Sequence, residues 1–150
     1  MGYCEIYRVS ARSRLFHFGF LFRFFHAGVI GGSMEITGKN GVITGDGKLE
    51  TTGKNLSITS ETGDINIGGD LDVRQDLTLK TGGDGEITLY KDKKVHEVMN
   101  ILAGRNISLQ TENGLILVEG KVDSRSGNIT FETETGEIFL KKNNNHKESR

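Results

Sequence analysis

One pattern of thirteen or fourteen residues occurs four times between Asn55 and Leu140, and it constrains the fold more than any other feature. Each copy begins with Asn or Asp, alternates apolar residues with Ser or Thr, passes a polar turn, and ends in a second apolar run. The copies are NLSITSETGDINI, DLTLKTGGDGEITL, NISLQTENGLILV and NITFETETGEIFL. Their first residues lie 21, 30 and 22 positions apart, and repetition near this period is typical of a solenoid.

The alternation within each copy predicts short β-strands that bury one face. In the first copy Leu56 and Ile58 flank Ser57, and a period of two places both apolar side chains on one side of a strand. Strands of about three to five residues enclose a continuous core only when coils stack about 4.8 Å apart. The sequence therefore predicts an all-β fold, a parallel β-helix (β-solenoid) of about five coils with a period of about 21–22 residues.

Each coil is predicted to contribute three strands. The first strand places apolar residues inward at Leu56 and Ile58, Leu77 and Leu79, Ile107 and Leu109, and Ile129 and Phe131. The second does so at Ile65 and Ile67, Ile87 and Leu89, Ile116 and Val118, and Ile138 and Leu140. A weaker third run contains Leu71 and Val73, Ile101 and Ala103, and Val122. The hydroxyl residues expected to face outward are Ser57, Thr78, Ser108 and Thr130.

Two positions of the repeat hold nearly the same residue in every copy. At the turn glycine we expect a backbone with positive φ, which glycine adopts readily. At the opening Asn or Asp we expect side chains that form hydrogen bonds from coil to coil. The glycines are Gly63, Gly85, Gly114 and Gly136, and the opening residues are Asn55, Asp76, Asn106 and Asn128.

The organisation around the clear copies follows from spacing and polarity. A degenerate coil begins at Met34, so the β-helix is predicted to span residues 34–140. The long coil carries its excess as a loop insertion at residues 90–100. Residues 141–150, KKNNNHKESR, are polar and predicted to form a disordered tail, in which Lys141 and Lys142 discourage edge pairing.

Residues 1–33 form a different, Phe- and Arg-rich extension. Six of the eight Phe residues lie between Phe16 and Phe25, after a basic stretch. An apolar run of this length resembles the core of a signal peptide, so an export remnant is one interpretation. The strict alternation from Phe16 to Phe24 would suit a strand that caps the solenoid. An upstream start joined accidentally to a gene fragment is the third interpretation.

Composition and motifs give few signs of chemistry. The chain has 19 basic and 20 acidic residues, a formal net charge of −1, so no nucleic-acid partner is predicted. A single cysteine, Cys4, excludes an intramolecular disulfide framework and a Cys-based zinc site. No histidine has metal-ligand spacing to a second ligand, and no catalytic motif occurs. We therefore predict that the chain is not an enzyme and holds no metal or cofactor.

Two groups of carboxylates keep an enzymatic alternative open, because β-helical enzymes that act on carbohydrates can carry acids on an outer face. One group shares the position after the turn glycine, and the other runs from the end of the first copy to the opening residue of the second. Neighbouring like charges could bind a cation or share a proton. No basic residue is predictably beside either group. The first contains Asp64, Glu86 and Glu137, and the second Asp70, Asp72 and Asp76.

Two surface features are candidates for partner binding. On the outer face of the second strand, Asn66 and Thr88 give way to Leu117 and Phe139, with Leu115 nearby, and an exposed apolar strip suggests a covering partner. The second candidate is the insertion loop, because insertions in solenoids gather on one face that often binds ligands. Its candidate residues are Lys91, Lys93, Lys94 and His96.

Two longer runs resemble a known family. GDINIGGDLDVRQDLTLKTGGDGEITL and GRNISLQTENGLILVEGKVDSRSGNITF are similar to haemagglutinin repeats of filamentous-haemagglutinin-type bacterial exoproteins, which are exported by two-partner secretion. The resemblance covers Ile36 to Leu140 and implies a right-handed β-helix, secretion or exposure at the bacterial surface, and a non-catalytic role as adhesin or stalk. It also implies an outer-membrane transporter for a full-length form, and a protein or carbohydrate on a host or neighbouring cell as partner. The chain would be a fragment or short relative of such a protein.

A third class of function is a self-assembling cytoskeletal β-helix like the bactofilins. Strands at the ends of a β-helix have free edges unless a cap covers them. The last copy, from Asn128, forms only an incomplete coil. End-to-end self-association is therefore a further expected interaction.

Overall fold

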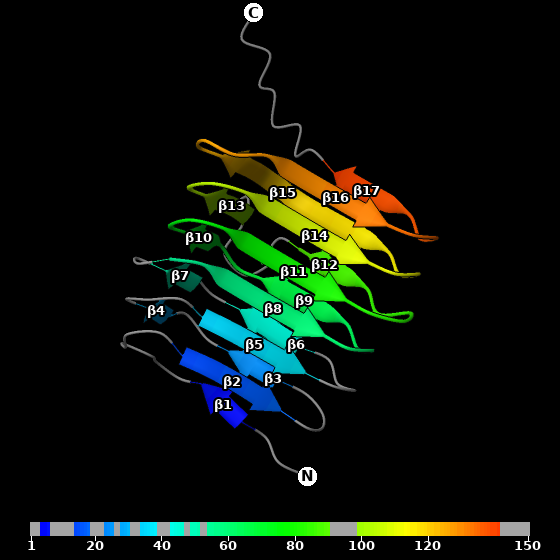
Figure 1. Ribbon diagram of the computed structural model, residues 1–150, viewed down its shortest axis with the longest axis horizontal. Helices are drawn as coiled ribbons and strands as arrows, with labels where there is room; N and C mark the ends of the chain where they lie inside the picture. Colours follow the sequence, from blue (N-terminus) through cyan, green and yellow to red (C-terminus); the bar gives the residue numbers. More distant parts are fainter. Residues whose placement is uncertain are drawn as a thin grey trace, which may run out of the picture.

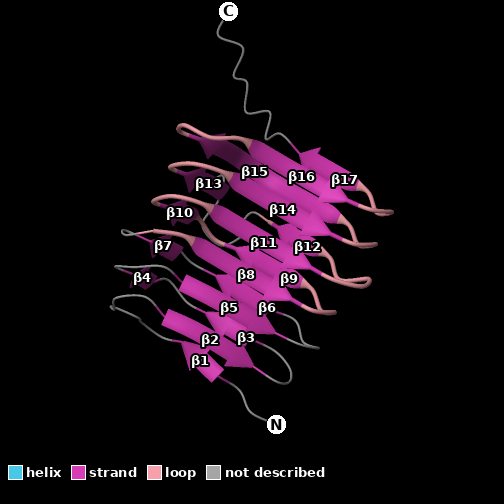
Figure 2. Ribbon diagram, in the orientation of Figure 1, coloured by secondary structure: helices cyan, strands magenta, loops and turns pink. Residues whose placement is uncertain are grey.

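A computed structural model of the chain describes residues 4–6, 14–18, 23–25, 28–30, 34–38, 43–46, 49–51, 54–90 and 99–141. The regular elements in these ranges are β-strands joined by turns, as Figure 2 shows. Within the same ranges, no helix is long and apolar enough to cross a membrane. The strands are β1 (Cys4–Ile6), β2 (Arg14–Phe18), β3 (Arg23–Phe25), β4 (Gly28–Ile30), β5 (Met34–Gly38), β6 (Ile43–Asp46), β7 (Leu49–Thr51), β8 (Leu56–Ser60), β9 (Ile65–Gly68), β10 (Leu71–Val73), β11 (Leu77–Thr81), β12 (Ile87–Leu89), β13 (Met99–Ala103), β14 (Ile107–Thr111), β15 (Ile116–Ser124), β16 (Ile129–Thr133) and β17 (Ile138–Lys141).

These strands wind into a parallel β-helix in which each coil adds one strand to each of three faces (Figure 1). The first face is the six-stranded sheet β2-β5-β8-β11-β14-β16. The second face contains β1, β3, β6, β9, β12, β15 and β17, and the third contains β4, β7, β10, β13 and β15. Strand β15, nine residues long, bends from the second face into the third and joins them into one 11-stranded sheet.

The predicted fold class is confirmed. Neighbouring strands on every face pair in parallel, and the chain turns in a right-handed sense as it rises from the amino to the carboxyl end (Figure 1). This is the handedness that crossover connections between parallel strands almost always adopt. The degenerate coil that begins at Met34 stacks on the first clear copy as predicted, with Met34 opposite Leu56 and Ile43 opposite Ile65.

The core consists of the inward columns that the alternation predicts. In the strand Leu56–Ser60, burial alternates between complete and partial, and Leu56 and Ile58 are fully buried. The outward residues Ser57, Thr78 and Ser108 are half-buried and Thr130 is exposed, so the predicted register is correct. Fully or nearly fully buried apolar residues are Leu49, Leu56, Ile58, Ile65, Ile67, Leu71, Val73, Leu77, Leu79, Ile87, Leu89, Ile101, Ala103, Ile107, Leu109, Ile116 and Val118.

The Phe-rich extension contributes strands to the same faces. Strand β2 pairs with β5, with Phe16 opposite Ile36, and β3 pairs with β6. Phe16 and Phe18 therefore lie on the first face and Phe24 lies on the second.

The column of turn glycines has a different cause from the one predicted. Among the described glycines, positive φ occurs at Gly83, where φ is 57°, and not in this column. A Cβ placed on Gly85 would lie 2.6 Å from the carbonyl oxygen of Gly63 in the coil below. Gly114 meets the carbonyl oxygen of Gly85, and Gly136 that of Gly114, in the same way. Glycine is needed here because successive coils pack backbone on backbone, not because φ is positive.

Buried hydroxyl groups form hydrogen bonds across the turn that leads to this glycine column. Thr81 Oγ1 donates a hydrogen bond to the carbonyl of Gly85 at 2.7 Å, and Thr111 Oγ1 donates to that of Gly114 at 2.7 Å. These threonines are almost completely buried. A buried hydroxyl is unfavourable unless it is hydrogen-bonded, so an inward Ser or Thr is stable where the chain turns and a carbonyl points inward.

Replacing Ile107 by Ala in the middle of the stack should reduce the free energy of unfolding by about 2–5 kcal/mol, because it leaves a cavity in a fully buried column. The matched control is Ser108→Ala, the adjacent outward position, which should stay within about 0.5 kcal/mol of the unmodified chain. Chemical denaturation measures both. Similar losses for the two variants would contradict the assigned register.

Replacing Gly114 by Ala should destabilise the stack by about 3 kcal/mol, because the added methyl group overlaps the carbonyl of Gly85. Gly83→Ala is the control: its nearest neighbouring atom lies 3.9 Å away, so it should lose only the roughly 1–2 kcal/mol of left-handed backbone strain. Thermal and denaturant unfolding compare the two. An equal or larger loss at Gly83 would show that close approach does not select the glycine.

Candidate functional site

The predicted apolar strip, which consists of Leu115, Leu117 and Phe139, lies on the second face near the carboxyl end. Leu117 and Phe139 are partners in the pairing of β15 with β17, in the column that holds Thr88 on β12. Leu115 immediately precedes β15 and lies two residues before Leu117. Both leucines are half-buried, whereas Phe139 is 49% exposed. The structure therefore brings the three residues together on the outer wall.

A second apolar surface lies beside the strip, at the end of the core. Ile129, Ile138 and Leu140 belong to inward columns but are 41%, 39% and 57% exposed. The expectation that all inward Leu and Ile residues are buried is wrong for these three. Burial in a β-helix needs coils on both sides, and no described strand stacks beyond β16 and β17.

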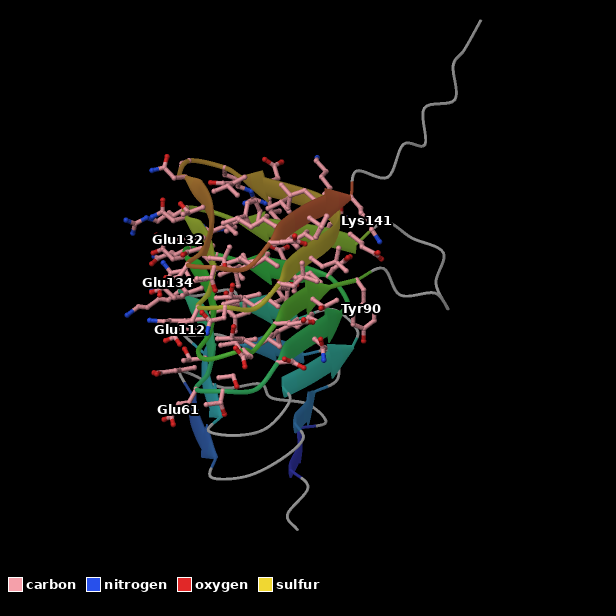
Figure 3. The ribbon with its side chains drawn as sticks, turned by 90° about the vertical axis from the view of Figure 1, so that its right-hand side faces the viewer. Glu61, Tyr90, Glu112, Glu132, Glu134 and Lys141 are labelled. Carbon is pink, nitrogen blue, oxygen red and sulfur yellow. The ribbon has the colours of Figure 1, made fainter. Side chains whose placement is uncertain are left out.

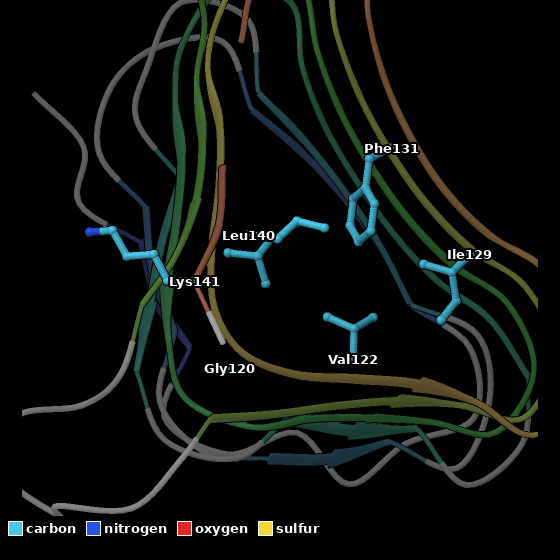
Figure 4. A pocket seen from close by; sticks show the side chains of 7 residues that line it. Gly120, Val122, Ile129, Phe131, Leu140 and Lys141 are labelled. Atoms are coloured by element: carbon cyan, nitrogen blue, oxygen red, sulfur yellow. The ribbon is translucent and has the colours of Figure 1, made fainter. Parts of the chain in front are cut away.

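The end of the core is hollow. An open pocket of about 250 Å³ lies between the last strands. Figure 4 shows the side chains of Val122 on β15, Ile129 and Phe131 on β16, and Leu140 on β17 around it. The incomplete last coil in the sequence indicates an open end. A lined pocket could not be predicted from it, because the pocket is formed by side chains from all three faces. Its lining residues are Val118, Gly120, Val122, Ile129, Phe131, Leu140 and Lys141.

The opening Asn and Asp residues form the predicted coil-to-coil ladder. The backbone N–H of Asp76 donates to Asn55 Oδ1 at 3.1 Å, and that of Asn106 donates to Asp76 Oδ1 at 3.0 Å. The N–H of Asn128 continues the series with a 3.0 Å bond to Asn106 Oδ1. Each rung pairs a backbone donor of one coil with a side-chain acceptor of the coil before, so the ladder holds successive coils in register.

One carboxylate of each acidic group forms the same kind of coil-to-coil hydrogen bond. Asp64 Oδ1 accepts a 2.8 Å hydrogen bond from the N–H of Glu86, and Asp70 Oδ1 accepts one of 2.8 Å from the N–H of Asn100. Leu115 separates Glu86 from Glu137 in the first group. The second group is divided between faces, because Asp70 precedes the third-face strand β10 whereas Asp76 precedes the first-face strand β11. The acids therefore lie along the wall and do not converge on one groove.

Further acids follow one corner of the rod. Figure 3 shows Glu61, Glu112, Glu132 and Glu134 on one side of the molecule, and Tyr90 and Lys141 on the other. Glu112 Oε2 accepts a 2.7 Å bond from the N–H of Gly83, and Glu132 Oε2 accepts a 3.1 Å bond from Gln110 Nε2. These side chains too connect neighbouring coils.

The insertion loop and a possible metal centre are the remaining candidates. The loop candidates Lys91, Lys93, Lys94 and His96 lie outside the described residues. Within the part of the chain that the structure describes, no group of three His, Cys, Asp or Glu side chains could hold a metal ion.

The ladder gives a prediction at Asp76. Asp76→Asn should leave stability nearly unchanged, because an amide oxygen occupies this position in the neighbouring coils and accepts the same bond. Asp76→Ala should reduce the free energy of unfolding by about 1–3 kcal/mol through the lost acceptor. Denaturant titration of both variants shows whether Asp76 is needed as a hydrogen-bond acceptor or as a negative charge. A loss of stability in Asp76→Asn equal to that in Asp76→Ala would contradict the ladder.

The site consists of a ladder-bonded polar wall, an apolar strip and an open apolar end. No family model, curated protein or solved structure matches the chain.

Proposed function

We propose that the chain is a non-catalytic segment of a β-helical rod that attaches to, or is displayed on, a cell surface. The repeat resembles that of surface adhesins, and the ladder ties each coil to the next by side chain as well as by backbone. Such a rod keeps its outward side chains in fixed positions over its length, which suits a stalk or a binding surface.

The observation that carries this proposal is the change within one outward column of the second face. Thr88 occupies it in one coil, and Leu117 and Phe139 occupy it in the next two. Outward apolar residues do not stabilise the core, and a contiguous apolar patch on a polar wall is typical of a binding surface. The apolar strip is therefore the proposed attachment surface.

The proposed partner is a protein or carbohydrate on a host or neighbouring cell. An aromatic ring such as that of Phe139 contributes large contact area to proteins and can pack on the apolar face of a sugar. Charged groups flank it: Lys141 Nζ lies 2.9 Å from Glu119 Oε1 on the neighbouring strand. Secretion and, for a longer form, an outer-membrane transporter belong to the same proposal.

An enzyme that acts on carbohydrates is the weaker alternative. Its acids would have to be available to substrate, whereas Asp64, Asp70 and Asp76 each accept a backbone hydrogen bond from the next coil. A general acid or base also needs a partner in reach of the same atom. The described carboxylates instead follow separate lines along the rod.

The attachment function predicts that the double variant Leu117→Thr/Phe139→Asn lowers binding roughly tenfold, because it removes the apolar contact area. The replacements copy Thr88 and Asn66 from the same column, so the fold should be preserved. Fluorescent beads coated with the purified chain are layered on cultured epithelial cells, and retained beads are counted after washing.

Beads coated with albumin and beads coated with the Ser108→Ala variant are the controls, since Ser108 lies on the first face. Beads coated with the Ser108→Ala variant should be retained as well as beads coated with the unmodified chain. Equal retention of the double variant would exclude the strip as the attachment surface, and retention no higher than with albumin would count against adhesion to these cells. New reducing ends after incubation with polygalacturonate or alginate would support the enzyme instead.

A further inference from the structure

The strand edges at the open carboxyl end lie at three different heights along the rod axis and do not form a flat surface. We call this stepped end the ramp. The last strands in chain order are the second half of β15 on the third face, β16 on the first, and β17 on the second. Because one coil advances by one strand spacing of about 4.8 Å, each of these three edges lies about a third of that spacing higher than the one before.

All three edges are incomplete in two respects. No described strand pairs with their outer sides, so backbone donors and acceptors face away from the stack. Inward apolar side chains of the same strands, among them Ile129, Phe131 and Leu140, surround the pocket (Figure 4). Whatever covers this end must therefore supply both strand edges and apolar side chains.

Two possible covers fit poorly. Residues 142–150, KNNNHKESR, contain no apolar side chain that could fill the hollow. In a head-to-tail arrangement with the three faces aligned, the first described strand of a second copy is β1 on the second face, and it would lie on β17. The described strands of the second copy would then leave gaps on the first and third faces, because β2 and β4 lie higher along that copy than β1 does.

A second copy placed tail to tail fits the ramp. A two-fold axis through the first face places β16 against β16 of the other copy, and β17 against the second half of its β15. The highest edge, that of β17, then meets the lowest edge of the other copy, that of β15. The two β16 edges, which are intermediate in height, meet each other. The distance between the facing edges is therefore equal on all three faces. One strand spacing closes the whole seam with antiparallel pairs.

We propose that the carboxyl end binds a second copy of this chain tail to tail, forming a two-fold symmetric dimer with a continuous core. The interface is isologous, so the same surface serves both copies and the assembly stops at two. Outward residues at the seam carry both signs of charge: Lys121 and Asp123 on β15, Glu132 on β16 and Lys141 on β17. This proposal does not depend on the attachment function, because it uses the end of the rod and not its wall.

Sedimentation velocity of the full chain over a wide concentration range is the first test. The expected result is a reversible dimer. Leu140→Lys should raise the dissociation constant of the dimer roughly 100-fold or more, because an ammonium group would be buried in an apolar interface. Leu117→Thr is the matched control on the wall and should leave the dimer unchanged.

A cross-link identifies the arrangement without disturbing the core. In a Cys4→Ser background, Thr130→Cys places one thiol on the outward side of β16, one residue from the middle of the strand, and mild oxidation should join two copies. The equivalent outward position of the central coil, Ser108→Cys, should not cross-link. Because Thr130 is exposed and outward, this variant should fold even if Leu140→Lys does not.

Four outcomes would overturn the proposal. A monomer at all concentrations excludes it, as does a monomer that dimerises only after residues 142–150 are removed, since the tail would then be the cover. Filaments would indicate head-to-tail stacking. A dimer lost in Leu117→Thr but retained in Leu140→Lys would indicate side-by-side contact through the apolar strip.

Discussion

Hydrogen bonding between parallel coils is the constraint on which the rest of this molecule depends. The backbone N–H and C=O groups of each strand find hydrogen-bond partners only in the strands directly before and after it on the same face. Each coil must therefore repeat the strand positions of its neighbours. The inward aliphatic columns, the glycine column and the Asx ladder all follow from this requirement. Departures from the repeat are tolerated where they leave the pairing intact, as in the longer coil that contains β12 and β13.

The same constraint separates structural from functional side chains. Polar residues that recur from coil to coil, such as Asp76 and Asn106, have a partner in the adjacent coil and so an evident structural role. Apolar residues that break the recurrence have none. Leu117 and Phe139 on the outer wall are informative because they depart from the polar residues of their column. Leu140 is informative for the opposite reason: it matches its apolar column, but no further coil covers it.

The sequence predicts the wall and the core well, because both depend on period-two alternation that is visible in one strand. Leu56, Ser57 and Ile58 are placed correctly from neighbours alone. The cause of the glycine column could not be predicted in this way, because the contact between Gly85 and Gly63 joins residues in different coils. Strand β15 was also hidden, since Glu119-Gly120-Lys121 has the composition of a turn but continues the strand around a corner. The exposure of Ile138 depends on what lies beyond its coil, which alternation does not encode.

The Asx ladder has a mechanical consequence. Its rungs, like the backbone bonds of the faces, run along the axis of the rod, so a force that pulls on one end acts on one coil at a time and not on many bonds in parallel. A coil that detaches releases 21, 22 or 30 residues, according to the spacing of its ladder residues. Such a segment extends to roughly 70–100 Å of chain. Under tension the rod would therefore lengthen in steps from its end and dissipate load gradually, while the coils that remain keep their outward surface intact.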